Sequence, residues 1–319
     1  MDLFQQLKFL PKVDLHINLT SSISTNLVFD LTNETSIIDV EEKMFQHNFK
    51  EYRESLKEPI RILKTKKNIV LAINDLIDRL EEDNILYCEL FLDLPLYKNI
   101  DEEKLINYIQ EVIEERNFNM QLVLCLSDNY PKEENIELIN LFEKYYKKGV
   151  NGIFFDKSNM TNLSDYSYIF DRLIKNNYPY ILNLNSQVTN QDHDIYMHAK
   201  RIIYSLPTRD NILDELIREN VMLEFPLSSL REANIITDLS NCLFYPLYQD
   251  NFNVCIVSRD MTSLNTDMLN EYCLLFNNSD ITLLDMIKIN INILENIDIN
   301  EELRESLINK LRIESNQLL

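Results

Sequence analysis

Several polar residues follow short apolar runs, a position from which side chains at the end of a parallel sheet can act on a ligand. His16 and Asn18 lie two residues apart, so in an extended strand both side chains point the same way. Two histidines at this spacing would suggest a metal pair, but an asparagine amide is a poor zinc ligand. The other candidates are Thr20, Asn183, Ser186, Tyr204, Arg259 and Asp260. Side chains of these types can form hydrogen bonds to the polar edge of a ligand.

Eight apolar runs, each typical of a buried parallel strand, must position these residues. Segments with a 3.6-residue apolar period separate the runs and predict amphipathic helices. Eight such units over roughly 250 residues or more favour a closed (β/α)8 barrel within one domain, residues 1–319, although a doubly wound open sheet fits the same periodicity. The expected strands are Val13–Ile17, Ile85–Leu92, Met120–Leu126, Val150–Phe155, Tyr180–Leu184, Arg201–Tyr204, Val221–Phe225 and Val254–Val257.

The sequence makes separate predictions for one long connection and for the ends of several helices. The long stretch from Ser21 to Asn84 is expected to hold extra helices over the barrel mouth. The chain has only two glycines, so another residue must supply the left-handed conformation that commonly ends a helix. Asparagine tolerates that conformation best after glycine, and four asparagines are expected to end helices in this way. They are Asn84, Asn119, Asn177 and Asn220.

Composition narrows the possible partners and the location of the protein. The 319 residues carry 52 acidic and 31 basic side chains, a formal charge of -21 that disfavours nucleic acid and anionic lipid as partners. No apolar stretch is long enough for a membrane span and the beginning lacks a signal-peptide pattern, so we expect a cytoplasmic protein. The five cysteines are widely spaced and predict free thiols. Oligomeric state stays open.

The opening sequence LPKVDLHINLTSS resembles the first motif of the adenosine deaminase family, L-P-K-x-E-L-H-x-H-L-D-G. Later landmarks follow in the family's order along nearly the whole chain. They are Tyr87-Cys88-Glu89 with Pro95 for Y-x-E and its proline, Gly152-Ile153 for G-I-D-L-A-G, Ala199 to Ile202 for A-x-R-I-G-H-G, Glu224 to Ser228 for E-x-C-P-x-S-N, Tyr245-Pro246 for H-P, Ser258-Arg259-Asp260 for S-D-D-P, and Asn270-Glu271-Tyr272 for the L-x-x-E-Y element. This resemblance implies the (β/α)8 barrel of the amidohydrolase superfamily.

The resemblance also implies which residues would hold zinc and catalyse deamination. Family members bind zinc through two histidines of the first motif, the histidine of H-A-G-E and the first aspartate of S-D-D-P. Only His16 is retained among these four, since Asn18, Asn183 and Arg259 take the other places. The remaining positions of the implied site are also altered: Thr20 replaces the aspartate of the first motif, Ser186 or Gln187 the catalytic glutamate, and Tyr204 the histidine of R-I-G-H-G, whereas Asp260 keeps the second aspartate of S-D-D-P.

These replacements predict that zinc does not bind and that no cofactor is present. Zinc lowers the pKa of bound water from 15.7 to about 7, a gain that asparagine and arginine cannot supply because neither suits the ion. His16 is then expected to be a hydrogen-bonded core residue. The Arg259 cation could pair with Asp260 or receive an anionic ligand.

Three functions remain open at this point. The favoured one is a pseudoenzyme that binds a small ligand, such as a purine nucleoside, or a protein partner at the barrel mouth without deaminating it. The second is an active purine nucleoside deaminase or hydrolase with a remodelled metal site that uses His16, Asp260 and a further carboxylate not assigned to a residue. The third is an interaction protein whose pocket is filled by its own side chains.

Overall fold

The computed structural model describes residues 2–32, 34–45, 52–157, 161–184, 188–206 and 212–318. Its eight strands form one parallel sheet in the order β1-β2-β3-β4-β5-β6-β7-β8. The predicted strands are confirmed with ends that differ by at most one residue. The observed bounds are β1 Lys12–Asn18, β2 Ile85–Leu92, β3 Met120–Ser127, β4 Val150–Asp156, β5 Tyr180–Leu184, β6 Arg201–Tyr204, β7 Met222–Phe225 and β8 Val254–Ile256.

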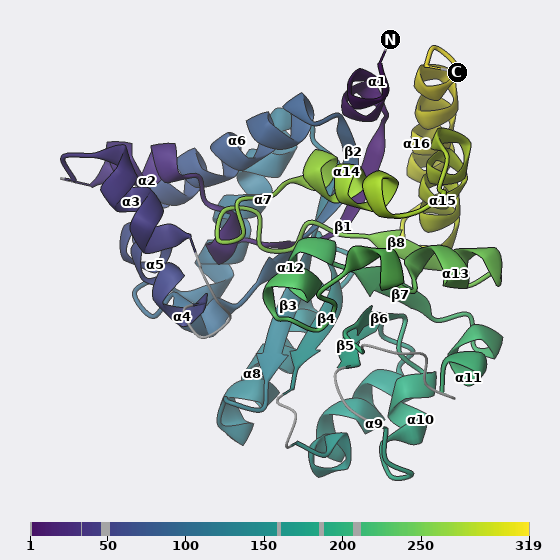
Figure 1. Ribbon diagram of the computed structural model, residues 1–319. Helices are drawn as coiled ribbons and strands as arrows, with labels where there is room; N and C mark the ends of the chain where they lie inside the picture. The colour runs from purple at the N-terminus through teal and green to yellow at the C-terminus, as the bar shows by residue number, and fades with distance from the viewer. Residues whose placement is uncertain are drawn as a thin grey trace.

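Helices surround the strands, and those that follow β1 extend away from the sheet at the left of the view (Figure 1). The helix before β1 is α1 Leu3–Phe9. The helices between β1 and β2 are α2 Thr25–Leu31, α3 Ile37–Met44, α4 Tyr52–Ser55, α5 Lys57–Ile62 and α6 Lys66–Glu82. The helices that follow β2 are α7 Glu102–Arg116, α8 Lys132–Tyr145, α9 Ser167–Lys175, α10 His193–Met197, α11 Leu213–Arg218, α12 Leu227–Glu232, α13 Phe244–Gln249, α14 Met268–Asn278, α15 Leu283–Asn296 and α16 Glu301–Ser315. The extra helices expected after the first strand are therefore present.

The sheet closes into a barrel through the residues that follow β8. Arg259 pairs with Ile17 of β1 in a parallel bridge. Its N–H donates to the His16 carbonyl at 2.8 Å, and its own carbonyl accepts from the Asn18 N–H at 2.8 Å. Arg259 has a φ of 60°, a left-handed conformation that is uncommon for a long side chain. The contact between the first and last strands excludes the open doubly wound sheet.

Asparagines supply most of the left-handed backbone, and three of the four predicted positions are confirmed. Asn84, Asn177 and Asn220 have φ values of 54°, 52° and 57°. The prediction for Asn119 is wrong, because α7 ends at Arg116 and the left-handed residue is Asn117, with φ of 49°. Asn119 instead uses its side chain, which donates to the Leu86 carbonyl of β2 at 3.1 Å.

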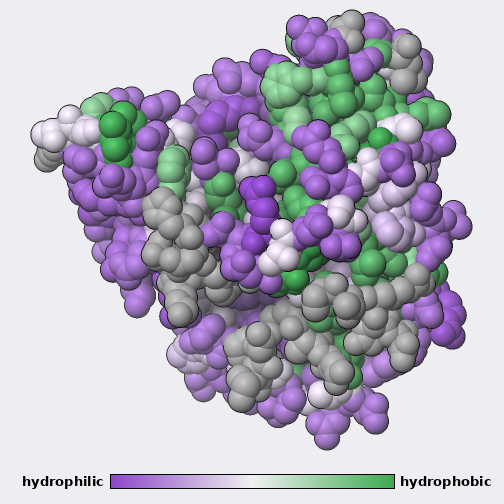
Figure 2. All heavy atoms as spheres, viewed as in Figure 1, coloured by the Kyte–Doolittle hydropathy of each residue, from purple (hydrophilic) through white to green (hydrophobic). Residues whose placement is uncertain are grey.

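Two sets of apolar side chains fill the molecule. The larger set lies between the strands and the surrounding helices. The smaller set lines the inside of the barrel and consists of Phe91, Val123, Cys125, Phe154, Ile181 and Ile203. All five cysteines are free thiols, and four of them are buried. The face toward the viewer in Figure 2 is largely hydrophilic, with apolar residues gathered near α1. Within the described residues, we find no helix both long and apolar enough to cross a bilayer.

Candidate functional site at the barrel mouth

Strand β1 directs alternate side chains into the barrel, and His16 is the central one. Its side chain is fully buried. The imidazole stacks on the Phe91 ring, with centroids 3.6 Å apart and an interplanar angle of 8°, and its edge meets Phe154. This packing fixes the plane of the ring and therefore the direction in which each of its two nitrogens points.

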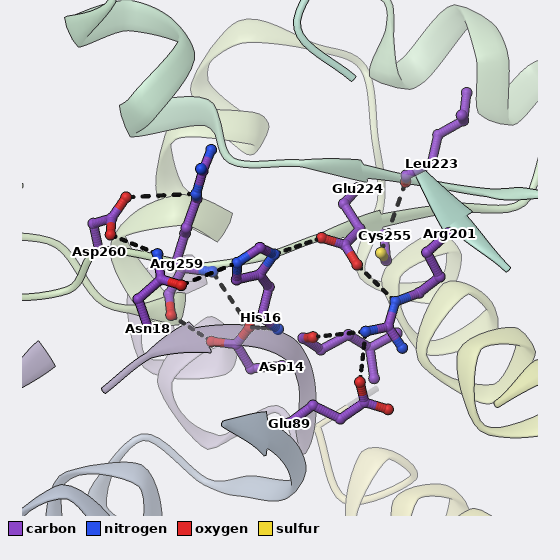
Figure 3. A network of polar contacts seen from close by, with 12 residues as sticks. Asp14, His16, Asn18, Glu89, Arg201, Leu223, Glu224, Cys255, Arg259 and Asp260 are labelled. Atoms are coloured by element: carbon purple, nitrogen blue, oxygen red, sulfur yellow. Dashed lines mark hydrogen bonds and ion pairs between the residues drawn. The ribbon is translucent and has the colours of Figure 1, made fainter. Parts of the chain in front are cut away.

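One nitrogen of His16 belongs to a buried network of charged residues (Figure 3). His16 Nδ1 lies 2.8 Å from Glu224 Oε2, and Glu224 Oε1 accepts from Arg201 Nε at 2.6 Å. The same guanidinium donates to Glu89 Oε2 at 2.5 Å. Burial alone would raise the pKa of Glu224, but Arg201 and His16 lower it, so this carboxylate is ionised. Burial lowers the pKa of His16, while Glu224 opposes that effect.

The sequence contains a signal for this network, although none of its three charged residues is among the predicted site residues. Glu89, Arg201 and Glu224 each stand within a predicted strand of otherwise mostly apolar residues. A charged residue in such a place is costly to bury unless it meets a partner, so three of them in one barrel indicate mutual pairing. They matched family landmarks, but their role as supports of His16 Nδ1 emerges only from the structure.

The second nitrogen of His16 faces an asparagine. His16 Nε2 lies 3.3 Å from the side-chain oxygen of Asn18, and Asn18 Nδ2 donates to Asp260 Oδ1 at 2.7 Å. Asp260 Oδ1 also accepts from Ser21 Oγ at 2.6 Å and from the Tyr52 hydroxyl at 3.1 Å. Since Nδ1 is engaged with a carboxylate, Nε2 is the only ring nitrogen left for a metal, and an amide stands beside it.

Arg259 completes the arrangement and decides whether zinc suits it. Its Nε lies 3.6 Å from Asp260 Oδ2, and Asp260 raises the pKa of Arg259 against the opposing effect of burial. A permanent cation therefore stands beside the one imidazole nitrogen that could coordinate zinc. Zinc prefers histidine, cysteine and carboxylate ligands, and one histidine with an amide and an arginine does not provide them. The described residues do not fit the metal that the resemblance implies.

Of the four remaining predicted residues, two bond to other side chains near the strand ends, one lies outside the described residues and one is buried in the core. Thr20 bonds to the Tyr97 hydroxyl at 2.5 Å, and Asn183 donates to Asp156 Oδ1 at 3.0 Å at the ends of β5 and β4. Ser186 lies outside the described residues, as does Gln187. Tyr204 does not line the mouth: it is fully buried in the larger core, where its ring lies 5.2 Å from that of Phe225. Alternation along β6 turns Ile203 inward and Tyr204 outward.

Asp14, also on β1, makes the stability of the barrel depend on pH. Its carboxylate accepts from Ser258 Oγ at 2.5 Å and from the His16 N–H at 3.2 Å, yet complete burial raises its pKa from 3.8 to about 7. The folded state therefore holds a proton that the unfolded state releases near pH 4. The resulting stabilisation is complete below that pH and is lost as the pH rises to about 7, by roughly 4 kcal/mol.

We expect Asp14→Asn to remove this dependence, because the amide stays neutral over the whole range. The measurement is urea denaturation of both proteins at intervals from pH 4.5 to pH 8. The difference in unfolding free energy between the two proteins should change steadily below pH 7 and become constant above it. Parallel curves across the whole range would show that Asp14 is already ionised in the folded protein.

The fold and mouth define a (β/α)8 barrel protein of the amidohydrolase type, and the chain belongs to the adenosine deaminase family, whose model matches residues 11–313. The adenosine deaminase of Clostridium acetobutylicum is 25% identical over 340 residues, covering 98% of this chain and 100% of the relative. The adenine deaminase of Candida albicans is 22% identical over 306 residues, covering 83% and 82%.

Solved structures share the fold at lower identity. The N6-methyl-AMP deaminase of Arabidopsis thaliana superposes with a TM-score of 0.83 at 15% identity, covering 98% of this chain and 99% of that one. A zinc-bound amidohydrolase from Burkholderia ambifaria superposes with a TM-score of 0.78 at 12% identity, covering 100% and 95%. At these identities, the likeness to the solved structures concerns the fold alone.

Proposed function

We propose that this member of the adenosine deaminase family is a pseudoenzyme that binds a small ligand at its barrel mouth without zinc and without deaminating it. The observation that carries the proposal is the group around His16 Nε2. An amide from Asn18 and the cation of Arg259 stand where the family resemblance places a histidine and an aspartate. The ligand that we favour is a purine nucleoside, because the relatives with similar sequences are named adenosine and adenine deaminases.

The electrostatics of the mouth support the loss of metal chemistry. Aspartate at position 259 would contribute a negative charge to a divalent ion, whereas Arg259 contributes a positive one, a change of two charges beside His16. Asp260 forms an ion pair with that cation at 3.6 Å and accepts from Asn18, so the positive charge of Arg259 already has an acidic partner in the absence of a metal. A protein built in this way gains nothing from zinc, because binding the ion would require breaking these contacts.

A second function is favoured by the inside of the barrel. Phe91 and Phe154 flank His16, and the six side chains of the smaller apolar set are at most 8% exposed. Such packing leaves the depth of the barrel closed to a ligand. A protein of this kind would act through its outer surface as an interaction protein, and a ligand bound at the mouth would have to rest above His16.

The decisive experiment combines metal analysis with an activity assay. The purified protein is dialysed with and without zinc, its metal content is measured by mass spectrometry, and adenosine conversion to inosine is followed by absorbance. The adenosine deaminase of Clostridium acetobutylicum serves as the positive control. We expect no retained zinc and no turnover in either preparation. Stoichiometric zinc with turnover would reject the pseudoenzyme and establish a remodelled active site.

Nucleoside binding then separates the two metal-free functions. A ligand that binds only the folded state stabilises it by RT ln(1 + L/Kd), where L is the free ligand concentration, so the melting temperature rises with the logarithm of that concentration once it exceeds the dissociation constant. We expect adenosine or a related purine nucleoside at millimolar concentration to stabilise the protein. Failure of a full panel of bases and nucleosides to do so would favour the interaction protein.

A further inference from the structure

The Oδ1 atom of Asp260 is fully occupied by groups of the protein itself. Its Oδ1 accepts from Asn18 at 2.7 Å, from Ser21 at 2.6 Å and from Tyr52 at 3.1 Å, and its Oδ2 lies 3.6 Å from Arg259 Nε. The residue is 6% exposed. A carboxylate oxygen accepts about two hydrogen bonds comfortably, so three donors on one oxygen leave no acceptor site for a ligand there. A ligand can reach Oδ1 only when one of the donors leaves.

The three groups that donate to Oδ1 differ in how firmly the surrounding structure holds them. Asn18 is part of β1, and Ser21 lies in the 3-10 turn that directly follows it and is 2% exposed. Both are fixed to the end of β8, since Arg259 bonds to the Asn18 N–H and the Ser21 carbonyl accepts from two N–H groups of the β8 loop. Tyr52 differs because it comes from α4, a four-residue helix outside the barrel, and makes the longest of the three bonds.

We propose that the Tyr52 hydroxyl is an internal occupant of the ligand site, which takes the place of a ligand N–H or O–H donor at Asp260 and must be displaced when the ligand binds. This inference rests on the proposed function, because it assumes that the mouth receives a ligand. It adds to it an autoinhibitory contact and names Tyr52 as the residue that limits affinity. The burial that strongly raises the pKa of Tyr52 keeps its hydroxyl protonated, and therefore a donor, at physiological pH.

The charges around Asp260 define the class of ligand that can replace Tyr52. The strand ends at the mouth carry the carboxylates of Asp93, Asp128, Asp156 and Asp260, against the cations of Arg259 and Lys157. Asp93 and Asp156 are close enough that Asp156 helps burial to raise the pKa of Asp93 to about 6. A site with this excess of negative charge favours an uncharged or cationic ligand that brings a hydrogen-bond donor, and it disfavours a phosphorylated one.

The test compares the binding of adenosine by the unsubstituted protein and by Tyr52→Phe, which keeps the ring and removes only the competing hydroxyl. Hydrogen bonds to a charged group are among the stronger ones in proteins, so we expect Tyr52→Phe to bind adenosine at least tenfold more tightly in calorimetric titration. AMP should bind more weakly than adenosine to both proteins. The matched control is Tyr248→Phe, which removes a hydroxyl that donates to Asp285 at 3.1 Å, away from the mouth, and should leave affinity unchanged.

A measurement on the unsubstituted sequence covers the case in which Tyr52→Phe is poorly folded. With 3-fluorotyrosine incorporated throughout, adenosine should move the fluorine resonance of Tyr52 and leave that of Tyr248 in place. Equal adenosine affinity in the unsubstituted protein and Tyr52→Phe, or no nucleoside binding by any variant, overturns the inference. Zinc-dependent turnover in the unsubstituted protein would instead reject the proposed function, and tighter binding by Tyr52→Phe would still support displacement of the hydroxyl.

Discussion

The triple variant Asn18→His, Asn183→His and Arg259→Asp is expected to retain about one zinc ion per molecule after dialysis, whereas the unsubstituted protein retains none. The substitutions supply two more imidazoles and a carboxylate at the positions that the family resemblance assigns to zinc ligands, and they remove the cation that repels the ion. Aspartate also accepts the left-handed conformation at position 259 more readily than arginine does, so the backbone can stay as it is. Metal content is measured by mass spectrometry after dialysis against a zinc buffer.

The double variant Asn18→His and Asn183→His, which keeps Arg259, is the matched control. It supplies three histidines but leaves the positive charge in place, so it should retain much less zinc than the triple variant. Because Ser186 and Gln187 are unchanged, neither variant is expected to deaminate adenosine, and metal binding is thereby measured apart from catalysis. Equal zinc in the double and triple variants would show that Arg259 does not exclude the ion.

The largest effect on stability is expected for Arg201→Met. Methionine fills a similar length but leaves Glu89 and Glu224 buried without their shared cation. Removing one partner from a buried ion pair costs about 3–5 kcal/mol, because the remaining charge stays uncompensated. Chemical denaturation at pH 7 should show a loss of unfolding free energy in this range.

Arg116→Met is the control for that substitution, since Arg116 also pairs with two carboxylates, Asp78 and Glu81, but at the surface. Ion pairs in such a place contribute at most about 1 kcal/mol, so its loss should be small. Adding Glu89→Gln and Glu224→Gln to Arg201→Met should recover part of the stability by removing the unpaired charges. A similar loss for Arg116→Met and Arg201→Met would contradict a special role for the buried network.

The barrel could be predicted closely because its strands are buried on both sides. Each one is a short apolar run with polar neighbours, which leaves little choice about where it begins or ends. The helix ends were less secure: α7 stops two residues before the position expected from Asn119, and nearby Asn117 satisfies the same left-handed requirement. Composition alone does not distinguish two asparagines so close together.

The site could be predicted only in part, because it depends on contacts between residues far apart in the chain. His16, Asn18, Arg259 and Asp260 meet as expected, since each follows from strand order. The outward turn of Tyr204 follows from alternation along β6, but the short strand left its direction unsettled in the sequence. The approach of Tyr52 to Asp260 had no signal, because nothing in the sequence relates α4 to the end of β8.

The use of asparagine in place of glycine at helix ends bears on the unfolded chain as well as on the folded one. Among the residues that the structure describes, seven of the nine non-glycine residues with positive φ are asparagines. Each costs some strain in the native turn, but an asparagine samples fewer backbone conformations than a glycine when the chain is unfolded. The chain therefore loses less conformational entropy at each such turn when it folds than it would with a glycine there. The local backbone strain in the native turn offsets part of that gain.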